Sequence, residues 1–238
     1  MTQRLPNYYL AAAVPDKLRN RQCRACRAPV DEEYKFCFQC SQRRSTRPDL
    51  AGFVAYAVNR GQSGTEMHRY KNQHPSPQAL NNVRLLLEHG LSHLRCAGQL
   101  VGAPVGAVAV IPSRSHYMAG TPSPLQQLCA WTIPQDTPVA ELHPTVGSVS
   151  DRRVHGNAFK VAKCPDQSHI TLVDDTWVSG ATTLSAAAAL RNAGVQRVSV
   201  LVLARWLDRN YDPTKKLPHS GQPNLWLAPT TGGMSVHS

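Results

Sequence analysis

The sequence lacks the features of a membrane or secreted protein. Its longest apolar stretch, residues 101–111, is interrupted by glycine and proline and is shorter than the ~18 residues that a membrane-spanning helix needs. No compact apolar run follows a basic start at the N-terminus, so we expect no secretory signal. The sequence also has no internal repeats. We therefore expect a soluble, cytoplasmic protein without a membrane partner.

Acidic residues are scarce as well. The 238 residues include 15 Asp and Glu against 26 Lys and Arg, a formal net charge of +11, while 42% of the residues are hydrophobic. This apolar share is enough to form a core, which excludes wholesale disorder. Residues 1–47 alone carry a net charge of +6. A basic protein of this kind favours nucleic acid, anionic lipid or phosphorylated small molecules as partners.

The seven cysteines are an odd number, which argues against a disulfide framework. Four of them form the pattern C-x2-C-x10-C-x2-C, namely Cys23, Cys26, Cys37 and Cys40. Two such pairs can present four thiolates to one ion, which is typical of a structural zinc site with no open coordination position. Unlinked redox cysteines and an iron–sulfur cluster are the alternatives. A module this small depends on its metal to fold.

Apolar runs that alternate with amphipathic segments predict an α/β fold, with a parallel sheet flanked by helices. The pattern predicts helices at residues 79–95, 125–131 and 181–192, and strands at 105–111, 141–149, 169–173 and 197–204. Residues 51–59 fit either type, and residues 66–77 are expected to form a polar loop. The expected parts are a zinc-ribbon-like module with a basic linker at 1–47, the α/β domain at 48–208, and a mobile tail at 209–238.

The candidate ligand-binding residues follow the strand that is expected at 169–173. Two adjacent acids, Asp174 and Asp175, come first, and a turn containing Gly180 then leads into a helix. Ligands of parallel sheets bind beyond the carboxyl ends of the strands. Backbone N–H groups of the turn suit a phosphate, and the carboxylates suit sugar hydroxyls. The pattern favours a ribose-phosphate ligand, and an ordinary capped strand–turn–helix is the alternative.

The residues VDDTWVSGATT (173–183) resemble the phosphoribosyl pyrophosphate loop of type I phosphoribosyltransferases. With the N-terminal four-cysteine element, the chain resembles the ComF/GntX group, in which a zinc ribbon is joined to a phosphoribosyltransferase domain. The segments RYKN (69–72) and SDRRVHGNAFKV (150–161) carry weaker similarity. The resemblance covers roughly residues 20–205.

The resemblance implies a role for each matching residue. Asp174 and Asp175 would hold the ribose hydroxyls as the catalytic pair. The turn that cradles the 5′-phosphate would consist of Thr176, Trp177, Val178, Ser179, Gly180, Ala181 and Thr182. Ser113 and Arg114 would lie where the family binds pyrophosphate. Trp177 and Val178 depart from the small aliphatic and hydroxyl residues that are usual there, and the stretch HYMAGTPSP (116–124) also departs from the family pattern.

The resemblance further implies that the protein binds phosphoribosyl pyrophosphate with Mg²⁺ and transfers phosphoribose to an acceptor, releasing pyrophosphate. Mg²⁺ would be bound by pyrophosphate and sugar oxygens. The alternative is a non-catalytic, nucleic-acid-associated protein, similar to competence proteins of DNA uptake. In that case DNA would bind weakly and without sequence preference to residues 1–47, including Arg43, Arg44 and Arg47 of the linker. The sequence leaves the acceptor and the oligomeric state open.

Overall fold

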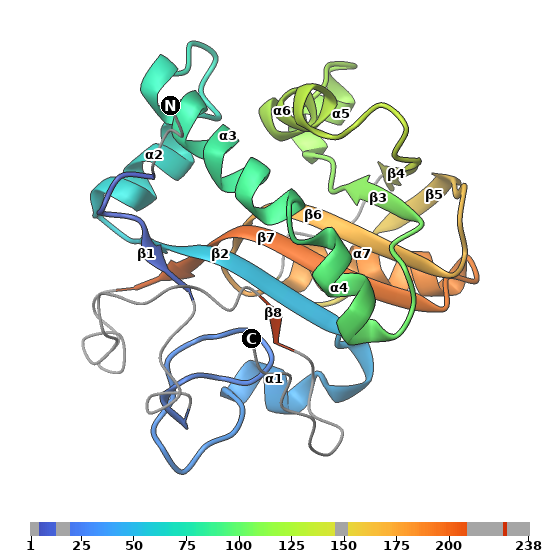
Figure 1. Cartoon of the computed structure of the whole chain (residues 1–238), viewed down its shortest axis with the longest axis horizontal. Coiled ribbons are helices and arrows are strands. Elements are labelled where there is room, and N and C mark those ends of the chain that lie inside the picture. The colour runs from blue at the N-terminus through green and yellow to red at the C-terminus, as the bar shows by residue number, and fades with distance from the viewer. Residues whose placement is uncertain (1–4, 13–19, 146–151, 209–225, 228–238) are drawn as a thin grey trace.

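The computed structural model describes residues 5–12, 20–145, 152–208 and 226–227, and the fold is described for these ranges (Figure 1). The strands are β1 (Leu10–Ala11), β2 (Leu50–Val58), β3 (Ala107–Val110), β4 (Val139–Pro144), β5 (Phe159–Lys163), β6 (His169–Trp177), β7 (Arg197–Leu207) and β8 (Trp226–Leu227). The α-helices are α1 (Phe38–Gln42), α2 (Gln62–Arg69), α3 (Pro77–Leu91), α4 (Leu94–Val101), α5 (Arg114–Met118), α6 (Pro124–Thr132) and α7 (Ala181–Asn192), and a short 3-10 helix, η2, covers Arg44–Thr46.

The strands of the described residues form one sheet in the order β1-β2-β7-β6-β3-β4-β5, with β8 also paired to β2. Strands β2, β7, β6, β3 and β4 run parallel to one another. Strands β1 and β8 join β2 in the antiparallel sense, and β5 joins β4 in the same way. The predicted α/β fold with a mostly parallel sheet is confirmed.

Both faces of the sheet are covered, as the nearly continuous apolar character of β6 and β7 requires. Helices α2, α3, α4 and α6 pack on one face. Helix α7 and the four-cysteine segment pack on the other, and the cysteine-bearing segment and α1 lie below β2 in Figure 1. Helix α3 approaches β7 closely at Gly90, where a Cβ atom would lie 2.8 Å from Leu201 Cδ1.

The predicted polar loop at residues 66–77 is wrong in its first part, because residues 62–69 form helix α2. The sequence of this helix does not show a regular apolar face, because one of the residues that faces the core is an acid, Glu66. Glu66 is buried and accepts hydrogen bonds from the hydroxyls of Tyr8 (2.6 Å) and Tyr9 (3.0 Å) and from Asn82 Nδ2 (2.9 Å). These contacts join α2 to the N-terminal segment and to α3.

Other boundaries also differ from the expected ones. The single helix expected at 79–95 is two helices, α3 and α4, separated at Ser92–His93. Strand β4 covers residues 139–144 in place of the expected 141–149, and residues 146–151 lie outside the described ranges. Strand β6 extends to residue 177 because it pairs with β7 through Trp177 and Arg205, and β7 extends to residue 207 because it pairs with β2 through Leu207. Within the expected tail at 209–238, only residues 226–227 are described.

None of the helices in the described ranges combines the length and the apolar character needed to cross a membrane.

Candidate functional site

The two adjacent acids of β6 lie inside the strand and contact elements on opposite faces of the sheet. Successive side chains of a strand alternate between its faces. Asp174 contacts α7, where its Oδ2 accepts a hydrogen bond from Thr183 Oγ1 (2.5 Å). Asp175 contacts the segment after α2, where its Oδ2 accepts from the Tyr70 hydroxyl and forms an ion pair with Lys71 Nζ (2.7 Å). The acids thus join both helical layers at the carboxyl end of the strand.

The carboxyl group of Asp174 is held in an unfavourable environment for its charge. Burial and, after it, the neighbouring charge of Asp175 raise its pKa to about 6, while the hydrogen bond from Thr183 and the charge of Lys71 oppose the shift. A buried carboxyl group whose pKa is raised in this way is typical of a functional site.

The turn between β6 and α7 is built around Gly180. This residue has φ +74°, and a Cβ atom here would lie 2.2 Å from the indole ring of Trp177. The ring itself is buried and meets Phe53 edge to face, with 5.4 Å between centroids. A non-glycine residue at position 180 would thus be both strained and in collision with the tryptophan.

A cavity of about 630 Å³ lies at this end of the sheet. Most of the residues assigned to the site from the sequence line it: Ser113, Asp174, Asp175, Thr176, Val178, Ser179, Gly180, Ala181 and Thr182. Trp177 is not among the described lining residues, because its side chain packs into the core beneath the turn. Its bulk therefore does not obstruct the cavity. Arg114 begins helix α5, and its side chain lies outside what the structure describes.

The cavity also has a cationic side that the sequence did not assign. Lys71, Arg152 and Arg153 line it, together with His116 and His155. The basic segment is attached to α7, because the backbone N–H of His155 donates to Ser185 Oγ (2.9 Å). Cationic side chains and the two carboxylates thus line the same cavity, and Lys71 is in direct contact with Asp175. This mixed lining suits a ligand that has both hydroxyls and phosphates.

Tyr70 and Lys71 are the residues that sequence reasoning missed as site members. Their segment, RYKN, was noted only for a weak similarity, and they lie more than 100 residues before Asp175. Burial and the charge of Asp175 raise the pKa of the Tyr70 phenol well above its usual value, so the phenol remains a hydrogen-bond donor. The Thr176 hydroxyl oxygen, by contrast, is buried without a hydrogen-bond partner among the described residues.

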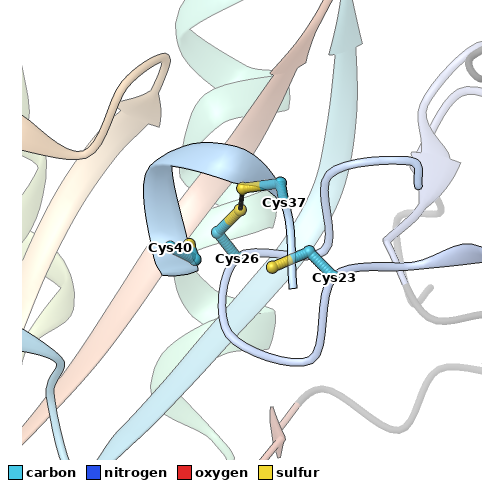
Figure 2. A group of neighbouring side chains, drawn as sticks. All are labelled: Cys23, Cys26, Cys37 and Cys40. Atoms are coloured by element: carbon cyan, nitrogen blue, oxygen red, sulfur yellow. Dashed lines mark hydrogen bonds between the residues drawn. The ribbon is translucent and has the colours of Figure 1, made fainter. Parts of the chain in front are cut away.

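The four cysteines of the N-terminal segment converge on one point (Figure 2). Their sulfur atoms all lie within 4.8 Å of one another, and Cys26 Sγ and Cys37 Sγ are 3.7 Å apart. A tetrahedral Zn–S distance of ~2.3 Å requires sulfur atoms separated by roughly 3.8 Å. The group therefore has the arrangement to hold a metal ion such as zinc.

The local backbone explains how the first two cysteines reach this point. Cys23 N donates to the carbonyl of Ala28 (2.7 Å) and Arg27 N donates to the carbonyl of Cys23 (2.9 Å), which closes a tight knuckle with Arg27 at φ +54°. Cys37 and Cys40 come from the start of helix α1 and its first turn. Hydrogen bonds from Cys26 and Cys37 lower the pKa of the Cys23 thiol, while hydrogen bonds within the same cluster raise the pKa of Cys26 and Cys40.

Two of the three linker arginines that the sequence placed on a DNA-binding surface, Arg43 and Arg47, make hydrogen bonds within the fold. Arg43 Nη1 donates to the carbonyl of Ser179 (2.6 Å), and Arg47 Nε donates to the carbonyl of Cys40 (3.1 Å). Arg44 is exposed, as are Arg24 and Lys35. A substitution test of DNA binding therefore needs these three exposed cations, because changing Arg43 or Arg47 would also disturb the fold.

A scan against models of protein families finds no match, and a search among curated proteins finds no similar sequence. The functional argument therefore depends on the geometry of the cavity and of the cysteine cluster.

Proposed function

We propose that the protein binds phosphoribosyl pyrophosphate, with Mg²⁺, in the cavity at the carboxyl end of β6 and transfers its phosphoribosyl group to an acceptor. The observation that carries the proposal is the shared cavity lined by Asp174, Asp175, the Gly180 turn and a set of basic side chains. The similarity of residues 173–183 to a phosphoribosyl pyrophosphate loop supports it. The four-cysteine cluster would hold a structural zinc ion, as in the ComF/GntX group.

The ligand's parts correspond to separate parts of the cavity. The 5′-phosphate would be bound by the turn at 176–182 and by the N-terminus of α7, where backbone N–H groups and the helix dipole favour an anion. Asp174 and Asp175 would accept hydrogen bonds from the two ribose hydroxyls.

The pyrophosphate group would be bound by the basic side of the cavity. Ser113 lines the cavity together with Lys71, Arg152 and Arg153, and Lys71 is ion-paired with Asp175. When ribose hydroxyls take over the carboxylate of Asp175, the Lys71 ammonium is released toward the phosphates. Mg²⁺, bound by pyrophosphate and ribose oxygens, would offset part of the ligand's negative charge.

Transfer requires no covalent nucleophile from the protein. The bond between the anomeric carbon and the pyrophosphate oxygen breaks, and its electron pair leaves with pyrophosphate. The anomeric carbon acquires oxocarbenium character, as in glycoside hydrolysis. A nucleophilic atom of the acceptor forms the new bond and then loses its proton. The carboxylates beside the ribose stabilise the developing positive charge, and the cavity holds both partners in position.

Calorimetric titration with phosphoribosyl pyrophosphate and Mg²⁺ tests the binding step. The double variant Asp174→Asn/Asp175→Asn should bind at least ~100-fold more weakly, since two charge-assisted acceptors are lost, with an unchanged circular dichroism spectrum. The matched control, Asp31→Asn/Asp136→Asn, removes two exposed acids and should bind as the natural protein does. Equal affinity of the site variant and the control would contradict the proposal.

A pyrophosphate-release assay with nucleobases, amines and ammonia as acceptors tests the transfer step. Release that depends on one acceptor class, and that is lost in the Asp174→Asn/Asp175→Asn variant, is the expected result. Tight binding of phosphoribosyl pyrophosphate without release in the presence of any acceptor would contradict catalysis and retain only the binding role.

A further inference from the structure

Two arginines, Arg205 and Arg43, connect the turn between β6 and α7 to the four-cysteine cluster. Arg205, near the end of β7, is buried, and its Nε donates to the backbone carbonyl of Cys26 (2.9 Å). Its Nη1 donates to the carbonyls of Trp177 (2.8 Å) and Val178 (3.1 Å). One guanidinium group thus contacts a cysteine knuckle and the start of the turn at the same time.

Arg43 makes a second connection, closer to the cavity. It lies directly after α1, the helix that carries Cys40. Its Nη1 donates to the carbonyl of Ser179 (2.6 Å), and its Nη2 donates to the carbonyl of Arg152 (2.7 Å). This side chain therefore joins the cysteine segment to the turn and to the basic segment that lines the cavity.

These contacts fix the direction of the peptide groups in the turn. A trans peptide is planar, and its C=O and N–H point to opposite sides. The carbonyls of Val178 and Ser179 are held by Arg205 and Arg43. The N–H groups of the same two peptides, which belong to Ser179 and Gly180, are thereby directed away from the arginines, and both residues line the cavity.

We propose that Arg205 and Arg43 are positioning residues that couple metal binding at the four-cysteine cluster to phosphate binding at the turn. The inference builds on the proposed function and assigns a role to residues that do not touch the ligand. A bound metal ion fixes the backbone of Cys26 and the start of α1. The two guanidinium groups, which are anchored to this segment, then hold the turn carbonyls in place through their hydrogen bonds. Without the metal, the turn loses its support and binds phosphate more weakly.

The test uses the full chain and ribose 5-phosphate as the probe. Arg205→Lys keeps the positive charge but lacks the several donors of the guanidinium group. It should retain one zinc ion per chain, bind ribose 5-phosphate about 10-fold more weakly, and speed hydrogen exchange of the amides at 176–183. Arg43→Gln should have a smaller effect in the same direction. The matched controls are Arg197→Lys, at the opposite end of β7, and Arg44→Gln, beside Arg43; both should behave as the natural protein does.

The mutual effect of the two ligands on each other's affinity distinguishes coupling from a purely structural role of the arginines, which would not change it. If metal and phosphate binding are coupled, saturating ribose 5-phosphate must tighten zinc binding by the same factor by which zinc tightens ribose 5-phosphate. A chelator competition experiment measures this factor, which should approach one in Arg205→Lys. In the natural protein, zinc removal should speed exchange at 176–183 more than at the amides of α3 at 83–87, which report only the change in global stability.

The two proposals fail in different ways. A natural protein that binds no ribose 5-phosphate would refute the proposed function, while the exchange measurements would still show whether zinc and the two arginines order the turn. Exchange rates at 176–183 that do not respond to zinc removal, to Arg205→Lys or to Arg43→Gln would overturn the coupling. The same holds if zinc affinity is identical with and without bound ribose 5-phosphate.

Discussion

At the scale of single residues, Asp174 and Asp175 are neighbours in sequence with different surroundings. Asp174 is hydrogen-bonded to Thr183, only nine residues later, whereas Asp175 meets Tyr70 and Lys71 from a remote part of the chain. The sequence predicted the acids because they end an apolar strand. It could not predict the Tyr70 and Lys71 contacts, since these depend on where α2 packs against the sheet.

Asp174→Asn should stabilise the fold at neutral pH. The pKa of Asp174 is raised from an ordinary value of 3.8 to about 6, first by burial. A carboxyl group with a raised pKa contributes stability below about pH 4, and this contribution is lost as the pH rises through about 6. The neutral amide avoids that loss and should raise the free energy of unfolding at pH 7 by about 1–3 kcal/mol.

Urea denaturation at pH 4, 5.5 and 7 measures this effect. The difference between Asp174→Asn and the natural protein should nearly vanish at pH 4, and the variant Asp136→Asn, at an exposed acid, is measured beside it as a control. An asparagine variant that is less stable than the natural protein at pH 7 would contradict the account.

At the scale of elements, the strand, turn and helix around Gly180 form the unit that places the site. The glycine and the start of α7 followed from the sequence, since an apolar strand, a turn residue and an alanine-rich helix have clear local signals. The length of β6 could not be predicted from the sequence, because Asp174 and Asp175 belong to the strand only through its pairing with β7. Helix α2 was missed for a related reason, because its buried Glu66 is stabilised by tyrosines from a distant segment.

Gly180→Ala should destabilise the protein and weaken ligand binding. The positive φ alone costs about 1–2 kcal/mol, and the added methyl group must displace the indole ring of Trp177, which lies 2.2 Å from the Cβ position. We expect a loss of about 2–4 kcal/mol in the free energy of unfolding.

Gly120→Ala is the matched control, because Gly120 has φ +66° but no atom within 4 Å of its Cβ position. Gly120→Ala should lose only the part of the free energy of unfolding that comes from the positive φ, about 1–2 kcal/mol. The double variant Gly180→Ala/Trp177→Leu should be less destabilised than the sum of its single variants, since the smaller side chain relieves the collision. Equal losses for Gly180→Ala and Gly120→Ala in urea denaturation would contradict this role of Trp177.

At the scale of the whole molecule, the cysteine segment and α7 share one hydrophobic core with the sheet. Cys23 and Cys26 are buried in the same cluster as Trp177 and the inward residues of β6 and β7. The C-x2-C spacing predicted the four-sulfur group but could not show this packing, which depends on contacts between segments more than 100 residues apart. The division of the chain at residues 47 and 208 stays a prediction.

Metal analysis of the purified protein should give about one zinc ion per chain. Cys37→Ser removes one of the four ligands and should abolish zinc retention and lower the melting temperature of the whole chain, since the module packs on the sheet. Cys96→Ser changes an exposed cysteine outside the cluster and should leave both unchanged. A fully folded natural protein that holds no metal would contradict the zinc assignment.

The central claim is that the turn between β6 and α7 binds the phosphate of a phosphoribosyl ligand. Amide chemical-shift mapping by nuclear magnetic resonance, with ribose 5-phosphate added to the isotope-labelled protein, tests it most directly. The account predicts saturable shifts that are largest at residues 174–183, that are weak with ribose alone, and that disappear in the Asp174→Asn/Asp175→Asn variant. Shifts confined to other surfaces, or no shifts at the turn with ribose 5-phosphate at millimolar concentration, would contradict it.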